Sequence, residues 1–103
     1  MERQVSEYRD NLESALRRLG PHISAGRIVG SDAAQFLVVD RGDRGVEIYG
    51  DERSGVTIDP ALDQDLQGEI SFPTFDLALN AAVRWLYGAT MAELLTHSGE
   101  AKG

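Results

Sequence analysis

The spacing of the apolar residues changes twice along the chain, and this change constrains the fold more than any other feature. From about residue 3 to residue 19, apolar side chains recur every three or four positions, which predicts an amphipathic helix. Gly20 and Pro21 follow directly and are expected to end it. The apolar positions of this helix are Val5, Tyr8, Leu12, Ala15, Leu16 and Leu19.

The middle of the chain has the apolar period of β-strands. Residues 35–39 form an unbroken, β-branched run that predicts a strand covered on both faces. After the turn-forming residues 40–45, apolar and polar residues alternate at 46–49 and again at 56–59, and a short strand is expected at 69–72. The pattern therefore predicts an antiparallel meander of three to four strands.

Helical spacing returns after the last predicted strand. Thr74 is expected to cap a helix that Gly88 ends, and Thr90 and Glu93 have the spacing of a capping box. A last short helix is therefore predicted to run to about His97. The apolar positions are Phe75, Ala78, Leu79, Ala82, Val83 and Leu86 in the first of these helices, and Met91, Leu94 and Leu95 in the second.

An antiparallel sheet with one buried face needs helices against that face. The order of elements therefore predicts an α+β two-layer sandwich with an N-terminal helix, an antiparallel meander and two C-terminal helices. The chain has 103 residues, of which 42% are hydrophobic and 26% charged, the mix of one globular domain. We expect a single domain over residues 1–97 and a flexible C-terminal tail over 98–103.

The chain lacks the features that mark membrane and secreted proteins. No apolar run approaches the roughly 18 residues that a membrane span requires. The N-terminal residues enter an amphipathic pattern directly, without a basic segment followed by an apolar one, so no secretory signal is expected. The chain also has no Cys. We therefore expect a cytoplasmic protein that does not associate with a membrane.

Acidic residues dominate the second half of the chain. The net charge is -7, and residues 59–76 contain neither Lys nor Arg. Such a surface repels nucleic-acid phosphates and attracts a basic protein partner, although acidity can also serve only to keep a small domain soluble. Trp85, at the edge of an apolar stripe, either packs in the core or anchors a partner. The expected partner-binding residues are Asp59, Asp63, Asp65, Glu69, Asp76 and Trp85.

No catalytic constellation is apparent in the sequence. The chain has two His residues and no Gly-x-Ser-x-Gly motif, so no pair of nucleophile and base can be named. Residues 63–71 place oxygen ligands at alternate positions, as calcium loops do, but the twelfth position is Thr74 where such loops carry Glu. We expect a protein that is not an enzyme and that holds no cofactor and no metal.

Part of the chain resembles a known family. Phe36, the hairpin residues 46–49, the segment 70–73 and the Ala-rich helix 78–86 together look like small immunity proteins of bacterial contact-dependent toxin systems. This resemblance covers about half of the chain and rests on the pattern of elements, so no individual family residue is carried over. The strands lack the exposed aromatic residues that such proteins often show. The resemblance implies an acidic module that binds and blocks a cognate toxin.

These features favour a small, acidic, non-enzymatic module that binds and blocks a basic protein, as an immunity or chaperone-like protein does. One alternative is a small-molecule-binding or regulatory domain with a pocket between sheet and helices. The other alternative is a structural subunit that forms a homodimer through the edge of the meander or through Trp85.

Overall fold

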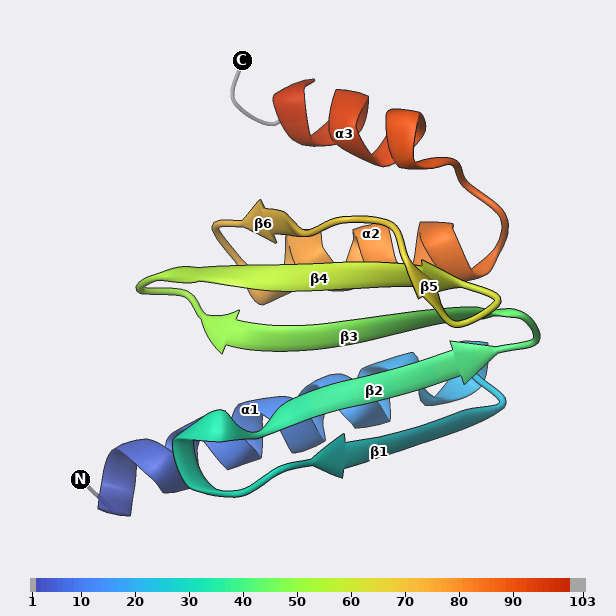
Figure 1. Ribbon diagram of the computed structural model, residues 1–103. Coiled ribbons are helices and arrows are strands. Elements are labelled where there is room, and N and C mark those ends of the chain that lie inside the picture. The colour runs from blue at the N-terminus through green and yellow to red at the C-terminus, as the bar shows by residue number, and fades with distance from the viewer. Residues whose placement is uncertain (1, 101–103) are drawn as a thin grey trace.

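A computed structural model describes residues 2–100 of the chain, with side chains described within residues 7–95 (Figure 1). One antiparallel sheet has the strand order β1-β2-β3-β4, and both β5 and β6 pair with the outer edge of β4. The elements are α1 (Glu2–Leu19), η1 (Gly20–His22), β1 (Ala25–Val29), η2 (Asp32–Ala34), β2 (Phe36–Arg41), β3 (Arg44–Asp51), β4 (Gly55–Leu62), β5 (Asp65–Leu66), β6 (Ile70–Phe72), α2 (Phe75–Leu86) and α3 (Met91–Glu100).

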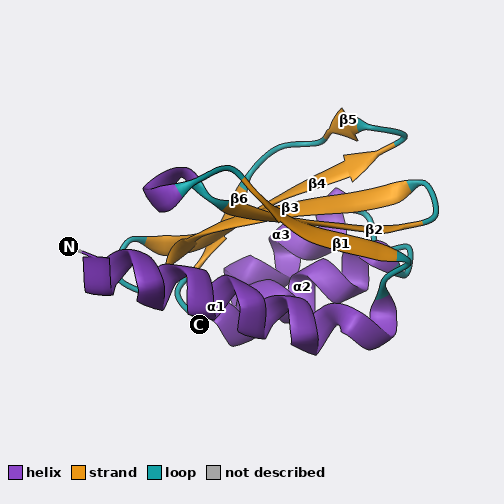
Figure 2. Ribbon diagram, turned by 90° about the horizontal axis from the view of Figure 1, so that it is seen from below, coloured by secondary structure: helices purple, strands orange, loops and turns teal. Residues whose placement is uncertain are grey.

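The sheet and the helices form two layers, which confirms the predicted α+β sandwich. Helices α1 and α2 lie against one face of the sheet, and α3 packs beside α2 (Figure 2). The opposite face carries no α-helix of the described chain, and we call it the uncovered face. Among the described residues, no helix is both long and apolar enough to span a bilayer.

The core lies between the helices and the helix-facing side of the sheet. Alternate residues of each strand point into it, so Leu37, Val39, Val46 and Ile48 are buried. From α1, the predicted positions Leu12, Ala15 and Leu19 are buried and Tyr8 and Leu16 are partly buried, whereas the side chain of Val5 lies outside the described residues. Strands β4 and β6 contribute Val56, Ile58, Ile70 and Phe72, and helices α2 and α3 contribute Ala78, Leu79, Ala81, Ala82, Trp85, Leu86 and Leu94.

Two predictions about the first strands were wrong. Residues 35–39 were expected to be covered on both faces, but in β2 only Leu37 and Val39 are buried, because α-helices cover one face of the sheet alone. The edge strand β1 was not predicted, since its apolar content is low. It pairs with β2 over all five residues, and Gly26 leaves room for the Leu16 side chain of α1, since a Cβ at this position would lie 2.6 Å from Leu16 Cδ1.

The segment with calcium-like spacing forms a tight hairpin between β4 and β5. Leu62 pairs with Asp65, so Asp63 and Gln64 are the two residues of the turn. Both have positive φ, 52° and 73°, as type I′ hairpin turns require. Because these residues form a two-residue turn, the segment does not adopt the longer loop of a calcium site.

The C-terminal helices begin where the caps were predicted. In the capping box before α3, the Thr90 N–H donates to Glu93 Oε1 at 2.8 Å and the Glu93 N–H donates to Thr90 Oγ1 at 3.1 Å. The helix continues to Glu100, so residues 98–100 are helical where a flexible tail was expected, and residues 101–103 lie outside the described residues. Leu95 was expected to pack on the core but is 53% exposed.

Replacing Thr74 with Ala is expected to lower the free energy of unfolding by about 1 kcal/mol. The Thr74 hydroxyl accepts from the Leu77 N–H at 3.1 Å at the start of α2, and alanine leaves that donor without its partner. Chemical denaturation followed by circular dichroism measures the change, with Thr74→Ser as the control that keeps the hydroxyl. An unchanged midpoint would mean that Glu52, which accepts from the Phe75 N–H at 2.8 Å, caps this helix alone.

Candidate functional site

Two carboxylates face each other across neighbouring strands on the uncovered face. The register of β3 and β4 places Glu47 directly opposite Asp59. Side chains at such positions have Cβ atoms about 4.5–5.5 Å apart, and two like charges there destabilise the sheet. Packing of the sheet therefore does not account for this pair.

Asp59 lies where the outer neighbour of β4 changes from β6 to β5. β6 pairs with β4 up to Ile58 and β5 pairs from Ala61 onward, so the chain connecting β5 and β6 borders Asp59. The N–H of Gln67, in that connection, donates to the Pro60 carbonyl at 2.8 Å. As a result Asp59 is only 8% exposed, and its Oδ1 has no hydrogen-bond partner among the described residues. A buried, unpaired carboxylate oxygen is costly in the absence of a ligand.

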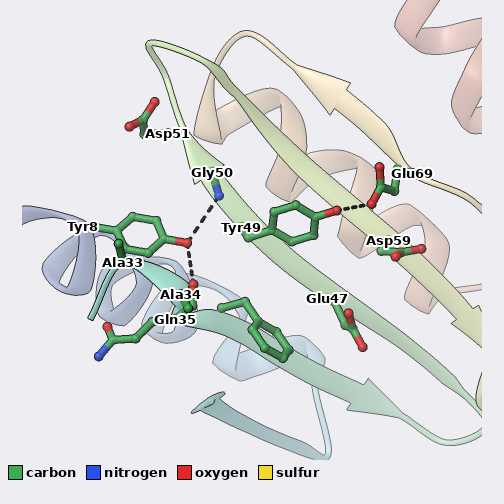
Figure 3. A pocket seen from close by; sticks show the side chains of 11 residues that line it. Tyr8, Ala33, Ala34, Gln35, Glu47, Tyr49, Gly50, Asp51, Asp59 and Glu69 are labelled. Carbon is green, nitrogen blue, oxygen red and sulfur yellow. Dashed lines mark hydrogen bonds between the residues drawn. The ribbon is translucent and has the colours of Figure 1, made fainter. Parts of the chain in front are cut away.

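Tyr49 holds a third carboxylate beside this pair. Its hydroxyl donates a hydrogen bond to Glu69 Oε2, as Figure 3 shows. Next to them, the hydroxyls of Thr57 and Ser71 form a hydrogen bond at 2.8 Å that links β4 to β6. The strands and these hydrogen bonds thus position Glu47, Asp59 and Glu69 on one part of the uncovered face.

The pKa values of this cluster reflect its burial and its negative charge. The pKa of Glu47 is raised above its ordinary value of 4.5, mainly by burial and to a smaller extent by the charge of Asp59. The pKa of Asp59 is raised above 3.8 by burial and by the charge of Glu69, and an interaction with the Gly68 backbone N–H partly offsets this rise. Burial, the hydrogen bond to Glu69 and the three carboxylate charges raise the pKa of Tyr49 above 10.0. No Lys, Arg or His in the described chain forms an ion pair with these three carboxylates.

A cavity of about 670 Å³ opens over this cluster, and we call it the acidic cavity. Figure 3 shows Glu47, Asp59 and Glu69 on one side of Tyr49, and Tyr8, Ala33, Ala34, Gln35 and a fourth carboxylate, Asp51, on the other. The far wall is held in place because the Tyr8 hydroxyl donates to the Gln35 carbonyl at 2.5 Å. The lining residues are Tyr8, Ala33, Ala34, Gln35, Phe36, Glu47, Tyr49, Gly50, Asp51, Asp59 and Glu69. Three of the four carboxylates that line the acidic cavity therefore lie at one end of it.

The structure brings together only two of the six expected partner-binding residues. Asp59 and Glu69 line the acidic cavity. Asp63 and Asp65 are exposed in the β4–β5 hairpin, which is outside the cavity lining. Asp76 lies in the helix layer, where it forms a salt bridge with Arg18 at 2.8 Å. The acidic residues of the second half of the chain are thus spread over several surfaces.

Trp85 is part of the core, so its prediction as an anchor for a partner or a dimer was wrong. The residue is only 2% exposed. Its indole N–H donates to the Ala61 carbonyl at 3.1 Å, and the Arg44 guanidinium lies 4.2 Å from its ring centroid. Arg44 also donates to the carbonyls of Trp85 and Ala89, at 2.9 Å and 2.6 Å. The indole is therefore enclosed by residues of its own chain.

Sequence reasoning missed Glu47 and Tyr49, and it also missed the apolar residues that line the acidic cavity, Ala33, Ala34 and Phe36. Glu47 was assigned only to the polar side of a strand. A signal for its pairing was nevertheless present: a hairpin with its turn centred near residue 53 brings residue 47 opposite residue 59. No comparable signal indicates that Ala33, Ala34 and Phe36 line the same cavity, because their placement depends on the η2 turn.

The alternative with a small-molecule pocket expected that pocket between sheet and helices, whereas the acidic cavity opens on the uncovered face. Within the described part of the chain, no group of three or more His, Asp or Glu side chains is arranged to hold a metal ion.

No protein-family model matches the chain, and neither the curated proteins nor the solved structures contain a match to it.

Proposed function

We propose that the protein is a non-enzymatic binding module whose uncovered face receives a basic region of a partner protein. The observation that carries this proposal is the uncompensated carboxylate cluster of Glu47, Asp59 and Glu69. A cationic group from a partner would supply the missing counter-charge. The net charge of -7 adds long-range attraction, which accelerates the encounter with a basic protein.

The resemblance to small immunity proteins supports one class of partner. Such a module binds a toxin and blocks it, and a basic toxin would complement the acidic uncovered face. A target of chaperone-like binding would need the same complementarity. In either case the module acts by occupying the partner's surface, and it needs no catalytic group of its own.

Two charge-reversal variants with the same net charge test this proposal. The face variant carries Glu47→Lys and Glu69→Lys, and the helix variant carries Glu7→Lys and Asp10→Lys on exposed positions of α1. Affinity capture from a lysate of the source organism identifies the partner, and titration of the purified partner then measures each affinity at low and high salt. We expect a basic protein that binds wild type and the helix variant, and that loses at least tenfold in affinity for the face variant.

The salt dependence provides a second criterion. Attraction between charges on the rim of an interface weakens as salt screens it, so binding to wild type should weaken at high salt. A partner that binds the face variant as tightly as wild type, or whose affinity does not change with salt, would contradict the proposal.

A second candidate function is a small-molecule-binding domain that uses the same cavity. The volume of about 670 Å³ favours it, because ligand sites commonly occupy about 300–1,000 Å³. The thermal midpoint separates the two candidates. A cationic small molecule that raises the midpoint, in a chain for which no protein partner is found, would support this second function.

A further inference from the structure

The acidic cavity combines features that select for the shape of a ligand as well as its charge. At one end, Asp59 is buried and its Oδ1 has no partner, and Glu47 lies directly opposite. Along the wall, the Phe36 and Tyr49 rings are partly exposed. The other end is formed by Ala33 and Ala34 of the η2 turn, by Gln35, and by Asp51, whose Oδ1 already accepts from the N–H groups of Arg53 and Ser54. A ligand that matches this arrangement is long, with an apolar stem and a cation at its tip.

We propose that the acidic cavity receives one arginine side chain of the basic partner. This inference rests on the proposed function and specifies its contact. The guanidinium lies between the carboxylates of Glu47 and Asp59, and the aliphatic stem packs along Phe36 and Tyr49. Asp59 Oδ1 thereby gains the hydrogen-bond donor that the described chain does not supply.

Arginine suits the cavity better than lysine for two reasons. The guanidinium is planar and presents five N–H donors, so it can donate to two carboxylates at once, whereas an ammonium presents one compact charge. The guanidinium is also more weakly hydrated, so it loses less hydration free energy when it enters a site beside Asp59, which is 8% exposed. A guanidinium can in addition stack on an aromatic face such as that of Tyr49.

The test uses three blocked amino acids as probes for the full chain: N-acetyl-arginine amide, Nα-acetyl-lysine amide and N-acetyl-citrulline amide, the last being a neutral copy of the first. Nuclear magnetic resonance titration follows the signals of Glu47, Tyr49 and Asp59. We expect saturating shifts with the arginine probe at a dissociation constant on the order of 1 mM, several-fold weaker binding of the lysine probe and no binding of the citrulline probe.

Two variants with the same change in charge locate the binding. Asp59→Asn keeps the volume of the side chain and removes the buried charge, and it should weaken binding of the arginine probe at least tenfold. Asp65→Asn removes an exposed charge from β5, outside the lining of the cavity, and should leave that binding unchanged. Equal losses in both variants would show that the probe responds to net charge alone and would overturn the proposal.

The remaining outcomes separate this inference from the proposed function. If the arginine probe causes no shifts at about 50 mM, while the face variant still loses its partner, the arginine site is wrong and the basic-partner function stands. If the probe binds at the acidic cavity but no protein partner is found, the cavity is a site for guanidinium groups, and the proposed binding of a partner protein is contradicted. Tighter binding of lysine than of arginine would overturn the assignment of a guanidinium.

Discussion

Replacing Asp59 with Asn is expected to raise the free energy of unfolding at pH 7 by about 1–2 kcal/mol in the absence of a ligand. The substitution keeps the shape of the side chain and removes a charge that is buried, faces Glu47 and has one unpaired oxygen. Removing a functional carboxylate thus stabilises the free protein, and the same variant is expected to lose the arginine probe. A gain in stability together with a loss of binding identifies a site where a ligand offsets the free-energy cost of a buried charge.

The gain should depend on pH in a defined direction. Because the pKa of Asp59 is raised in the folded protein, ionisation of Asp59 costs stability. This cost is absent below the ordinary pKa of 3.8, grows as the pH rises through the raised pKa, and is complete above it. The difference between Asp59→Asn and wild type should therefore be largest at neutral pH and shrink on acidification. Denaturant titrations over this pH range measure it.

Two further readouts control this prediction. Asp65→Asn changes the charge equally at an exposed position and should shift stability by no more than a few tenths of a kcal/mol. In Asp59→Asn the pKa of Glu47 should fall toward 4.5, since the charge of Asp59 contributes to its rise after burial. A loss of stability in Asp59→Asn at neutral pH would mean that the Asp59 carboxylate has stabilising partners within the fold.

Replacing Trp85 with Ala is expected to lower the free energy of unfolding by about 3–5 kcal/mol, the largest effect predicted for this chain. The change leaves a cavity beneath the sheet and removes the donor to the Ala61 carbonyl. It also removes the surface on which the Arg44 guanidinium lies. Because Trp85 is the only tryptophan, circular dichroism must follow the unfolding of this variant.

Trp85→Phe is the matched control, and it keeps the variant series informative if the alanine variant does not fold. Phenylalanine fills most of the volume but lacks the indole N–H, so a smaller loss of about 1–2 kcal/mol is expected. In wild type, iodide should not quench the fluorescence of Trp85, which is 2% exposed. Strong quenching, or an alanine variant as stable as wild type, would contradict the core assignment.

The secondary structure was largely predictable because its signals are local. The three- and four-residue spacing of α1 and the caps at Thr74 and Thr90 depend on residues within one or two helical turns. The alternation in β3 and β4 depends on immediate neighbours. Local signals failed at β1, whose few apolar residues form a strand only because β2 and α1 lie beside them.

The candidate site was only partly predictable because it is assembled from distant segments. The sequence indicated an acidic second half and named Asp59 and Glu69, but it did not separate them from Asp63, Asp65 and Asp76. That separation depends on burial and on pairing: Asp59 lies in a gap between two short strands, whereas Asp76 pairs with Arg18. Neither property can be read from the identity of the residue.

The sequence by itself determined the α+β class, the main helices and strands and the acidic charge, since these follow from composition and from the order of nearby residues. Only the tertiary structure decided that Trp85 is in the core, that Glu47 faces Asp59, and that a cavity opens above them. The physical reason is that burial, hydrogen-bond partners and the shift of a pKa depend on the segments that surround a side chain in space, and long-range packing alone brings those segments together.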